Sequence, residues 1–229
     1  MNLLAFDTST EYLSIALLKD MQIFRFDTLA HQAHSKMILP QIQSLLNQAQ
    51  VQLADLHGIA FGAGPGSFTG VRIAAGVAQG LAFGHQLPVV DICTLLALAE
   101  ASGHDQVIAC LDARMGEVYY AAYQKVLDVW QVVEHPNVYK PHQVPNLQGD
   151  GWVGAGSGWQ TYTDVLNHQY HGQLQSVLPS LLPTAASIIT LAQPVFLSGH
   201  AKSAMLAMPM YVRNRVALKT TERMQGLSL

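Results

Sequence analysis

Four glycines and a proline lie within the nine residues GAGPGSFTG, which span residues 62–70. A turn of this kind between a strand and a helix can bind a phosphate group through backbone amides. The P-loop pattern needs a lysine directly after its last glycine, but Val71 follows Gly70. The Rossmann pattern fails as well, because Thr69 stands where a third glycine is needed. The stretch is therefore either a general anion site at a helix N-terminus, with Ser67 or Thr69 as the cap, or only a tight turn.

Two aspartates, Asp7 and Asp112, are the other candidates for phosphate or magnesium contact, because each ends an apolar stretch. Residues 3–18 can be laid over residues 108–123 with a constant shift of 105, which places Asp7 on Asp112. Two-lobed ATPases of the actin and sugar-kinase type hold magnesium and phosphate at such positions, with a glycine-containing hairpin after the aspartate. Here the first hairpin, DTSTEY, has no glycine. The catalytic apparatus is incomplete, and we predict no catalytic residue.

Other reactive side chains do not form a recognisable site. His31 and His34 lie three residues apart, but no Asp or Glu completes a cluster nearby, so we expect surface histidines and no metal site. Cys93 and Cys110 lie in apolar stretches, which indicates buried thiols rather than a disulfide. No nucleophile elbow or Cys–His signature is present.

The composition limits the class of protein. Only 12% of the 229 residues are charged, the formal net charge is −3, and half of the residues are apolar. The low charge indicates either a surface that a partner covers or a large interior, and both readings remain open. No uncharged apolar run is long enough to span a bilayer, and we expect a cytoplasmic protein with no membrane contact.

The elements that must position these residues follow from periodicity. Three strands are predicted in the first thirty residues, followed by a helix within residues 34–50, a buried strand before the glycine-rich turn, a long helix over 68–85 and a strand over 88–93. This order predicts a mixed sheet with helices packed on it. Because the opening pattern returns after 105 residues, we predict two related lobes, 1–103 and 104–229, the second ending in a basic tail.

The helix predicted over 68–85 has an unusual composition, because Arg72 is its only charged residue. Gly76, Gly80 and Gly84 form a stripe at a spacing of four residues, beside stripes of alanine and of larger apolar residues. A glycine inside a helix costs roughly 0.5–1 kcal/mol relative to alanine, so three of them indicate close approach of another surface. That surface belongs either to this chain or to a partner.

These residues carry a resemblance to a known family. The segments LLAFDTST at the N-terminus, His34 with the LP at 39–40, GPGSFTGVRIA at 64–74 and YVRNRVA near the C-terminus resemble bacterial TsaB, also called YeaZ. The resemblance extends over essentially the whole chain, and GPGSFTGVRI is its most specific part.

The resemblance implies an actin-like ATPase fold (α/β) with two RNase H-like lobes of mixed sheets flanked by helices. It also implies a non-catalytic subunit that pairs with TsaD, the enzyme that transfers a threonylcarbamoyl group to N6 of adenosine 37 in tRNAs reading ANN codons. The ATPase TsaE would join the pair, and tRNA would be bound through the complex. Alone, the chain would form a homodimer. It would have no cofactor of its own, and ATP or ADP with magnesium would be shared at the partner interface.

The family's dimer surface lies on the two helices of the first lobe. Carried over residue by residue, the implied contact residues are Met37, Ile38, Ile42, Leu45, Leu46, Ile73, Ala74, Val77, Ala78 and Leu81. The glycine-rich turn would then position an interface helix, while Asp7, Ser67, Thr69 and Asp112 stay candidates for nucleotide contact. The alternative is an ATPase or small-molecule kinase of the same fold that acts alone. A peptidase ranks third, because it needs a nucleophile or a metal cluster.

Overall fold

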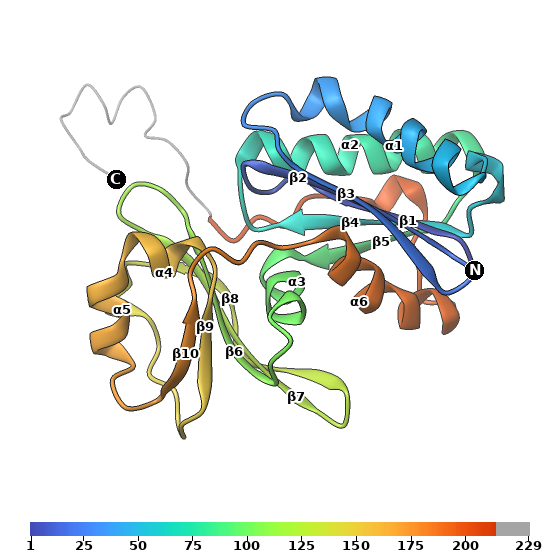
Figure 1. The fold of residues 1–229 in the computed structure, drawn as a ribbon. Coiled ribbons are helices and arrows are strands. Elements are labelled where there is room, and N and C mark those ends of the chain that lie inside the picture. Colours follow the sequence, from blue (N-terminus) through green and yellow to red (C-terminus); the bar gives the residue numbers. More distant parts are fainter. Residues whose placement is uncertain (214–229) are drawn as a thin grey trace.

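The computed structural model describes residues 1–213, which form two lobes, each built on a five-stranded mixed sheet (Figure 1). In the first sheet the strand order is β3-β2-β1-β4-β5, with β1 antiparallel to β2 and parallel to β4. Its strands are β1 (Leu3–Asp7), β2 (Tyr12–Lys19), β3 (Gln22–Leu29), β4 (Gly58–Gly64) and β5 (Val89–Cys93). All residues of β1 and β4 are buried, because helices cover both faces of these central strands.

The second sheet repeats this topology in the order β8-β7-β6-β9-β10. Its strands are β6 (Gln106–Asp112), β7 (Val118–Val126), β8 (Val129–Tyr139), β9 (Trp152–Ala155) and β10 (Leu174–Leu178). The prediction of an α/β fold with two related mixed sheets is confirmed. The boundary between residues 103 and 104 stays a prediction.

The constant shift of 105 residues holds for the first strand of each lobe but not for the second. Asp7 pairs with Ser14, seven residues further on, whereas Asp112 pairs with Val118, only six residues further on. The turn of the second hairpin is therefore one residue shorter. Residues of β2 correspond to residues of β7 with a shift of 104 rather than 105, so that Ser14 corresponds to Val118.

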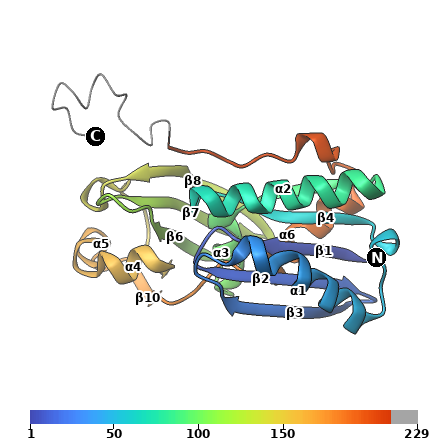
Figure 2. The same cartoon turned by 90° about the horizontal axis from the view of Figure 1, so that it is seen from above.

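Two helices, α1 (His34–Ala49) and α2 (Phe68–His85), cover the outer face of the first sheet and lie side by side (Figures 1 and 2). The apolar side chains of α1 recur at helical spacing, so that one face of the helix packs on β2. Helix α2 begins after Ser67, whose hydroxyl accepts a hydrogen bond from the Gly70 amide and caps the helix. Of the two predicted caps, Ser67 is the one that the structure uses.

Between the two sheets, each lobe is packed by a helix that follows the other lobe in the chain (Figure 1). Helix α3 (Thr94–Ala101) follows the first sheet in the chain, yet Leu95 and Leu98 pack in the core of the second sheet. Helix α6 (Ala185–Leu197) follows the second sheet and packs Ile188 on the first. The two helices also contact each other, so they form a junction between the two lobes. The remaining helices of the second lobe are α4 (Ser157–Thr161) and α5 (Thr163–Gln169).

After α6 the chain returns along α2 as a segment, 199–213, that contains the short 3-10 helix Ala204–Leu206 and that we call the strap (Figure 2). Lys202 forms a β-bridge with Val89, and the Met210 amide donates to the Ala63 carbonyl oxygen at 2.8 Å. The strap ends against the hairpin of the second lobe. No helix within residues 1–213 is long and apolar enough to cross a membrane.

Candidate partner-binding surface

Three amides of the glycine-rich turn donate hydrogen bonds within the chain. The Ser67 amide donates to the Ser9 carbonyl oxygen at 2.7 Å, and the Gly64 amide donates to Thr94 Oγ1 at 3.1 Å. The Gly70 amide is bound by the Ser67 hydroxyl at 3.3 Å. A phosphate site at a helix N-terminus needs free amides that point outward. These three donors are not free, which favours the reading of the stretch as a tight turn.

The glycines of this turn allow the first hairpin to lie directly against it. A Cβ atom on Gly70 would overlap the carbonyl oxygen of Thr8, and one on Gly66 would overlap that of Ser9. The Thr8 hydroxyl also donates to the Gly70 carbonyl oxygen at 2.7 Å. The hairpin therefore occupies the space beside the turn, and the residues present do not fit a magnesium-bound nucleotide there. Thr69 is exposed, and Ser67 serves as the helix cap.

Asp7 is 1% exposed and does not reach a cleft. Its Oδ1 accepts hydrogen bonds from the amide and the hydroxyl of Ser9, at 2.9 and 2.7 Å. Its Oδ2 has no hydrogen-bond partner and lies against Gly62, where a Cβ atom would overlap it. Burial raises the pKa of the Asp7 carboxyl to about 6, and the Ser9 hydrogen bonds and the nearby His34 offset only part of this effect.

Asp112 lies in the matching place in the second lobe but in a different environment. Its Oδ1 accepts a hydrogen bond from the Arg114 amide at 2.9 Å, and its Oδ2 lies 3.5 Å from the Arg114 guanidinium. The same guanidinium lies 3.3 Å from Glu11 of the first hairpin. The two hairpins that would flank a nucleotide are thus joined to each other by an ion pair, and within residues 1–213 no hydrogen bond or ion pair links Asp7 to Asp112.

Six of the ten predicted contact residues lie inside the first lobe. Their exposed fractions are 3% or less, because they pack on the first sheet, and they are Ile38, Ile42, Leu45, Leu46, Ala74 and Ala78. In this structure they form the core beneath the helices, and this corrects the expectation that their side chains meet a partner. The other four, Met37, Ile73, Val77 and Leu81, are half-buried and pack at the edge of the same core.

The outer surface of the two helices is made by other residues. Gly76, Gly80 and Gly84 are exposed, and a Cβ atom on any of them would have no atom within 4 Å. On α1, Leu39 is 50% exposed, and Lys36 is the only charged residue of that helix. We call the exposed side of α1 and α2 the two-helix face. It has little charge and, along the glycine stripe, open space for another backbone.

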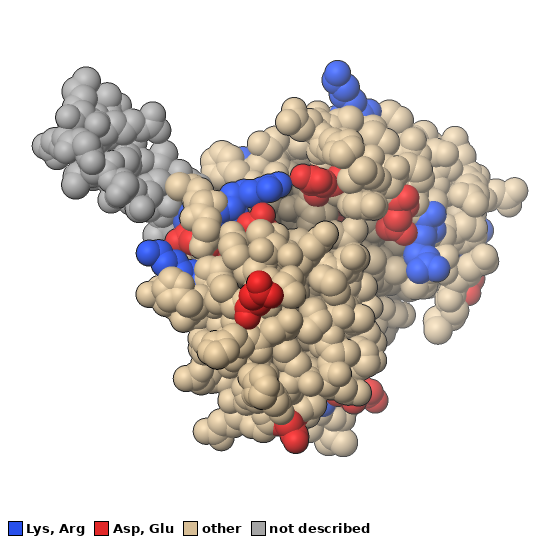
Figure 3. Space-filling model, turned by 60° about the vertical axis from the view of Figure 1, so that its left-hand side comes forward, with Lys and Arg blue, Asp and Glu red and all other residues tan. Residues whose placement is uncertain are grey.

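The strap extends this surface on the far side of α2. A hollow of about 540 Å³ lies between the two, lined by Gly76, Gln79, Gly80, Phe83, Ala204 and Met205. Phe83 and Met205, two large apolar side chains at this hollow, are each 72% exposed. Charged groups are few over another side of the molecule as well (Figure 3). The strap was not predicted from the sequence, although the Met-rich stretch AMLAMPM at 204–210 indicated an apolar segment there.

The remaining predicted side chains are structural in the part of the chain that is described. His34 is 5% exposed and lies 3.1 Å from the Tyr12 carbonyl oxygen, so the expectation of a surface histidine was wrong for this residue. Arg213 pairs with Glu117 and donates to the Ala113 carbonyl oxygen at 3.1 Å. The other basic residues of the tail lie outside the described residues. Within residues 1–213, no three His, Cys, Asp or Glu side chains gather as a metal ion would require.

The chain matches a known protein family and is similar to proteins of two bacteria. The family described as "TsaD: tRNA N6-adenosine threonylcarbamoyltransferase" matches residues 28–219. The chain is 39% identical to the tRNA threonylcarbamoyladenosine biosynthesis protein TsaB of Escherichia coli, over 96% of this chain and 97% of the relative. It is also 39% identical to the TsaB protein of Haemophilus influenzae, over 96% of both chains.

The fold agrees with solved structures. YeaZ from Pseudomonas aeruginosa superimposes with a TM-score of 0.85 at 38% identity, over 92% of this chain and 99% of that one. A second Pseudomonas aeruginosa structure, described as an uncharacterized protein with similarity to peptidase YEAZ, gives a TM-score of 0.86 at 37% identity, over 93% and 99%.

Proposed function

Because this chain belongs to the TsaB (YeaZ) family of tRNA threonylcarbamoyladenosine biosynthesis proteins, we propose that it is the non-catalytic subunit that pairs with TsaD. In this role it stabilises the arrangement of TsaD that transfers the threonylcarbamoyl group to N6 of adenosine 37 in tRNAs reading ANN codons. TsaE joins the pair, and tRNA is bound through the complex in the cytoplasm. Alone, the chain pairs with a second copy through the same surface.

The observation that carries this proposal is the two-helix face. Its glycine stripe lies open, although glycine inside a helix lowers stability by roughly 0.5–1 kcal/mol relative to alanine. A helix of the partner can approach α2 closely over these positions, since no side chain stands in the way. The half-buried Ile73, Val77 and Leu81 then become fully covered. An interface of standard size buries about 1,600 Å² in total, so α1 is expected to contribute beside α2.

The non-catalytic role is supported by the geometry around the glycine-rich turn. Three of the turn's amides are bound within the chain, Asp7 is buried, and an ion pair joins the two hairpins. A kinase or ATPase that acts alone would need these groups free to hold a magnesium-bound nucleotide. We therefore favour the scaffold over the kinase, and we expect ATP, ADP and magnesium to act on the TsaD side of the complex.

The test is light scattering after size exclusion, on the chain alone and mixed with its cognate TsaD. Gly80→Arg places a long charged side chain on the two-helix face at a position where the free chain has room for it. Asn167→Arg, on the exposed side of α5, is the matched control. We expect the wild type and the control to form a heterodimer and Gly80→Arg to remain unpaired. A wild-type chain that ignores TsaD, or a Gly80→Arg chain that pairs normally, would overturn the proposal.

A further inference from the structure

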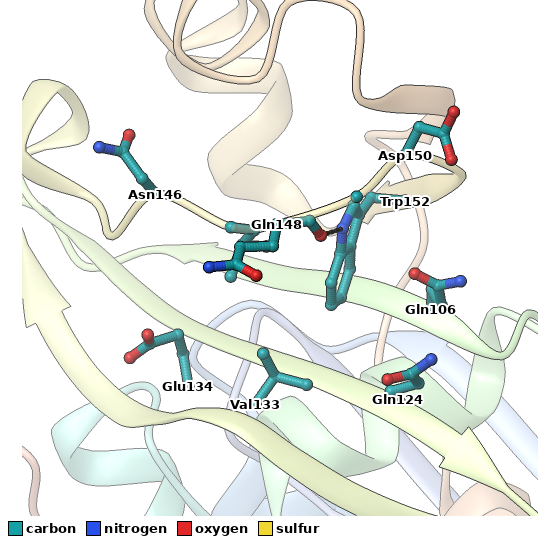
Figure 4. Close-up of a pocket in the computed structure, with 10 residues that line it drawn as sticks. Gln106, Gln124, Val133, Glu134, Asn146, Gln148, Asp150 and Trp152 are labelled. Carbon is teal, nitrogen blue, oxygen red and sulfur yellow. Dashed lines mark hydrogen bonds between the residues drawn. The ribbon is translucent and has the colours of Figure 1, made fainter.

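A second hollow lies in the second lobe, on strands β6, β7 and β8 and away from the helices of the two-helix face (Figures 1 and 4). Its volume is about 640 Å³, which lies within the range of small-molecule sites. Strands β6, β7 and β8 form its floor, and the loop before β9 forms its roof. The lining residues are Gln106, Gln124, Val133, Glu134, Asn146, Leu147, Gln148, Gly149, Asp150 and Trp152.

The roof loop is held rigidly from behind. The Gln173 side-chain amide donates to the carbonyl oxygens of Leu147 and Gly149 at 2.7 and 2.9 Å. Trp152 Nε1 donates to the Gln148 carbonyl oxygen at 3.1 Å, and Trp152 is 3% exposed. Because the backbone of this loop is already fixed, a ligand that binds does not pay the entropy cost of ordering it.

Several side chains that line the hollow are polar and form no hydrogen bond within residues 1–213. Figure 4 shows Glu134 and Gln148 on one side of Trp152, Gln106 and Gln124 on its other side, and Asp150 at the rim. Within residues 1–213 none of these Gln, Glu and Asp side chains has a hydrogen-bond partner in the chain. Two of the lining residues are carboxylates and none is a lysine or an arginine, so the hollow attracts cations and repels phosphate.

From this combination we propose that the hollow binds a guanidinium group. A guanidinium is planar, always charged and carries five N–H donors, which suit the Glu134 carboxylate and the carboxamide oxygen of Gln148 on the same side of the hollow. The source is either a free small molecule or an arginine side chain of a protein partner, and the same chemistry recognises both. This site is independent of the two-helix face and of the function proposed above.

The test is isothermal titration of the full-length protein with N-acetyl-arginine amide. N-acetyl-citrulline amide, which has nearly the same shape without the charge, is the matched control ligand. We expect saturable binding of the arginine compound and at least tenfold weaker binding of the citrulline compound, because one charge-assisted hydrogen bond accounts for about that factor. Titration with agmatine and with an arginine-containing tripeptide separates the two sources: tighter agmatine binding indicates a small molecule, and tighter peptide binding a partner protein.

Glu134→Gln removes the charge that faces the hollow and keeps the size of the side chain, and Asp128→Asn makes the same change of charge at the exposed β7–β8 turn. We expect about tenfold weaker binding in Glu134→Gln and no change in Asp128→Asn. Equal affinity for the arginine and citrulline compounds, an equal effect of both substitutions, or no saturable binding of the arginine compound would each overturn the proposal.

Discussion

The buried Asp7 carboxyl makes the stability of the protein depend on pH in a defined direction. Folding raises the pKa of this group from 3.8 to about 6, chiefly because burial disfavours its charged form. Between these two values the folded chain binds more protons than the unfolded chain. The free energy of unfolding therefore falls as the pH rises from about 4 to about 6, and the loss remains constant above that.

The size of this loss follows from the pKa shift. Each pKa unit corresponds to about 1.4 kcal/mol, so a shift of about two units removes about 3 kcal/mol of stability by neutral pH. Asp7→Asn cannot lose a proton but keeps an oxygen for the Ser9 hydrogen bonds. Its buried amide lowers stability by an amount that does not depend on pH. The difference between wild type and variant should thus change by about 3 kcal/mol across this pH range.

The assay is urea unfolding at several pH values from 4 to 7.5, on the wild type, Asp7→Asn and the exposed-site control Asp20→Asn. We expect the wild type and the control to lose stability in parallel, while Asp7→Asn lacks this part of the loss. If the curves of the wild type and Asp7→Asn stay parallel between pH 4 and 6.5, Asp7 does not titrate as a buried group, and the reasoning is refuted.

Three further predictions concern packing and use thermal or urea unfolding. Gly70→Ala should lower the free energy of unfolding by about 1–3 kcal/mol, because its Cβ overlaps the first hairpin, whereas Gly76→Ala should raise it by about 0.5–1 kcal/mol. Equal changes in the free energy of unfolding for Gly70→Ala and Gly76→Ala would contradict this prediction. Ser67→Ala should lower it by about 1 kcal/mol through loss of the cap, and the exposed Thr69→Ala should leave it unchanged. Arg213→Met should lower it by about 1.5–3 kcal/mol, and an unchanged midpoint would show that the strap's ion pair is not stabilising.

Much of the fold could be predicted from local patterns. The three opening strands, the helix after the glycine-rich turn and the repeat of Asp7 in Asp112 are visible because strand and helix periodicity is a property of neighbouring residues. The Ser67 cap is visible for the same reason. The one-residue difference between the two hairpins was missed, because a constant shift assumes equal turn lengths.

The surface of the helices was harder to predict than their positions. The resemblance assigned Leu45 of α1 and Ala78 of α2 to a partner, although both lie in the core. A helix that is apolar nearly all round, such as α2, does not show by its composition which side faces its own sheet. Gly76 and Gly80 indicated the exposed side of α2 better than the larger apolar residues did, because a residue without a side chain gains little from burial in the core. The strap depends on contacts such as that of Gln79 with Ala207, 128 residues apart, and no local pattern predicts these.

The central claim is that the two-helix face pairs with TsaD. Hydrogen–deuterium exchange of the chain, alone and mixed with its cognate TsaD, tests it most directly, because exchange slows where a partner restrains the backbone. We predict slower exchange along residues 68–85 and 34–49 in the mixture, with residues 146–150 of the second lobe unchanged. Slower exchange confined to the second lobe, or no change along 68–85, would contradict the account.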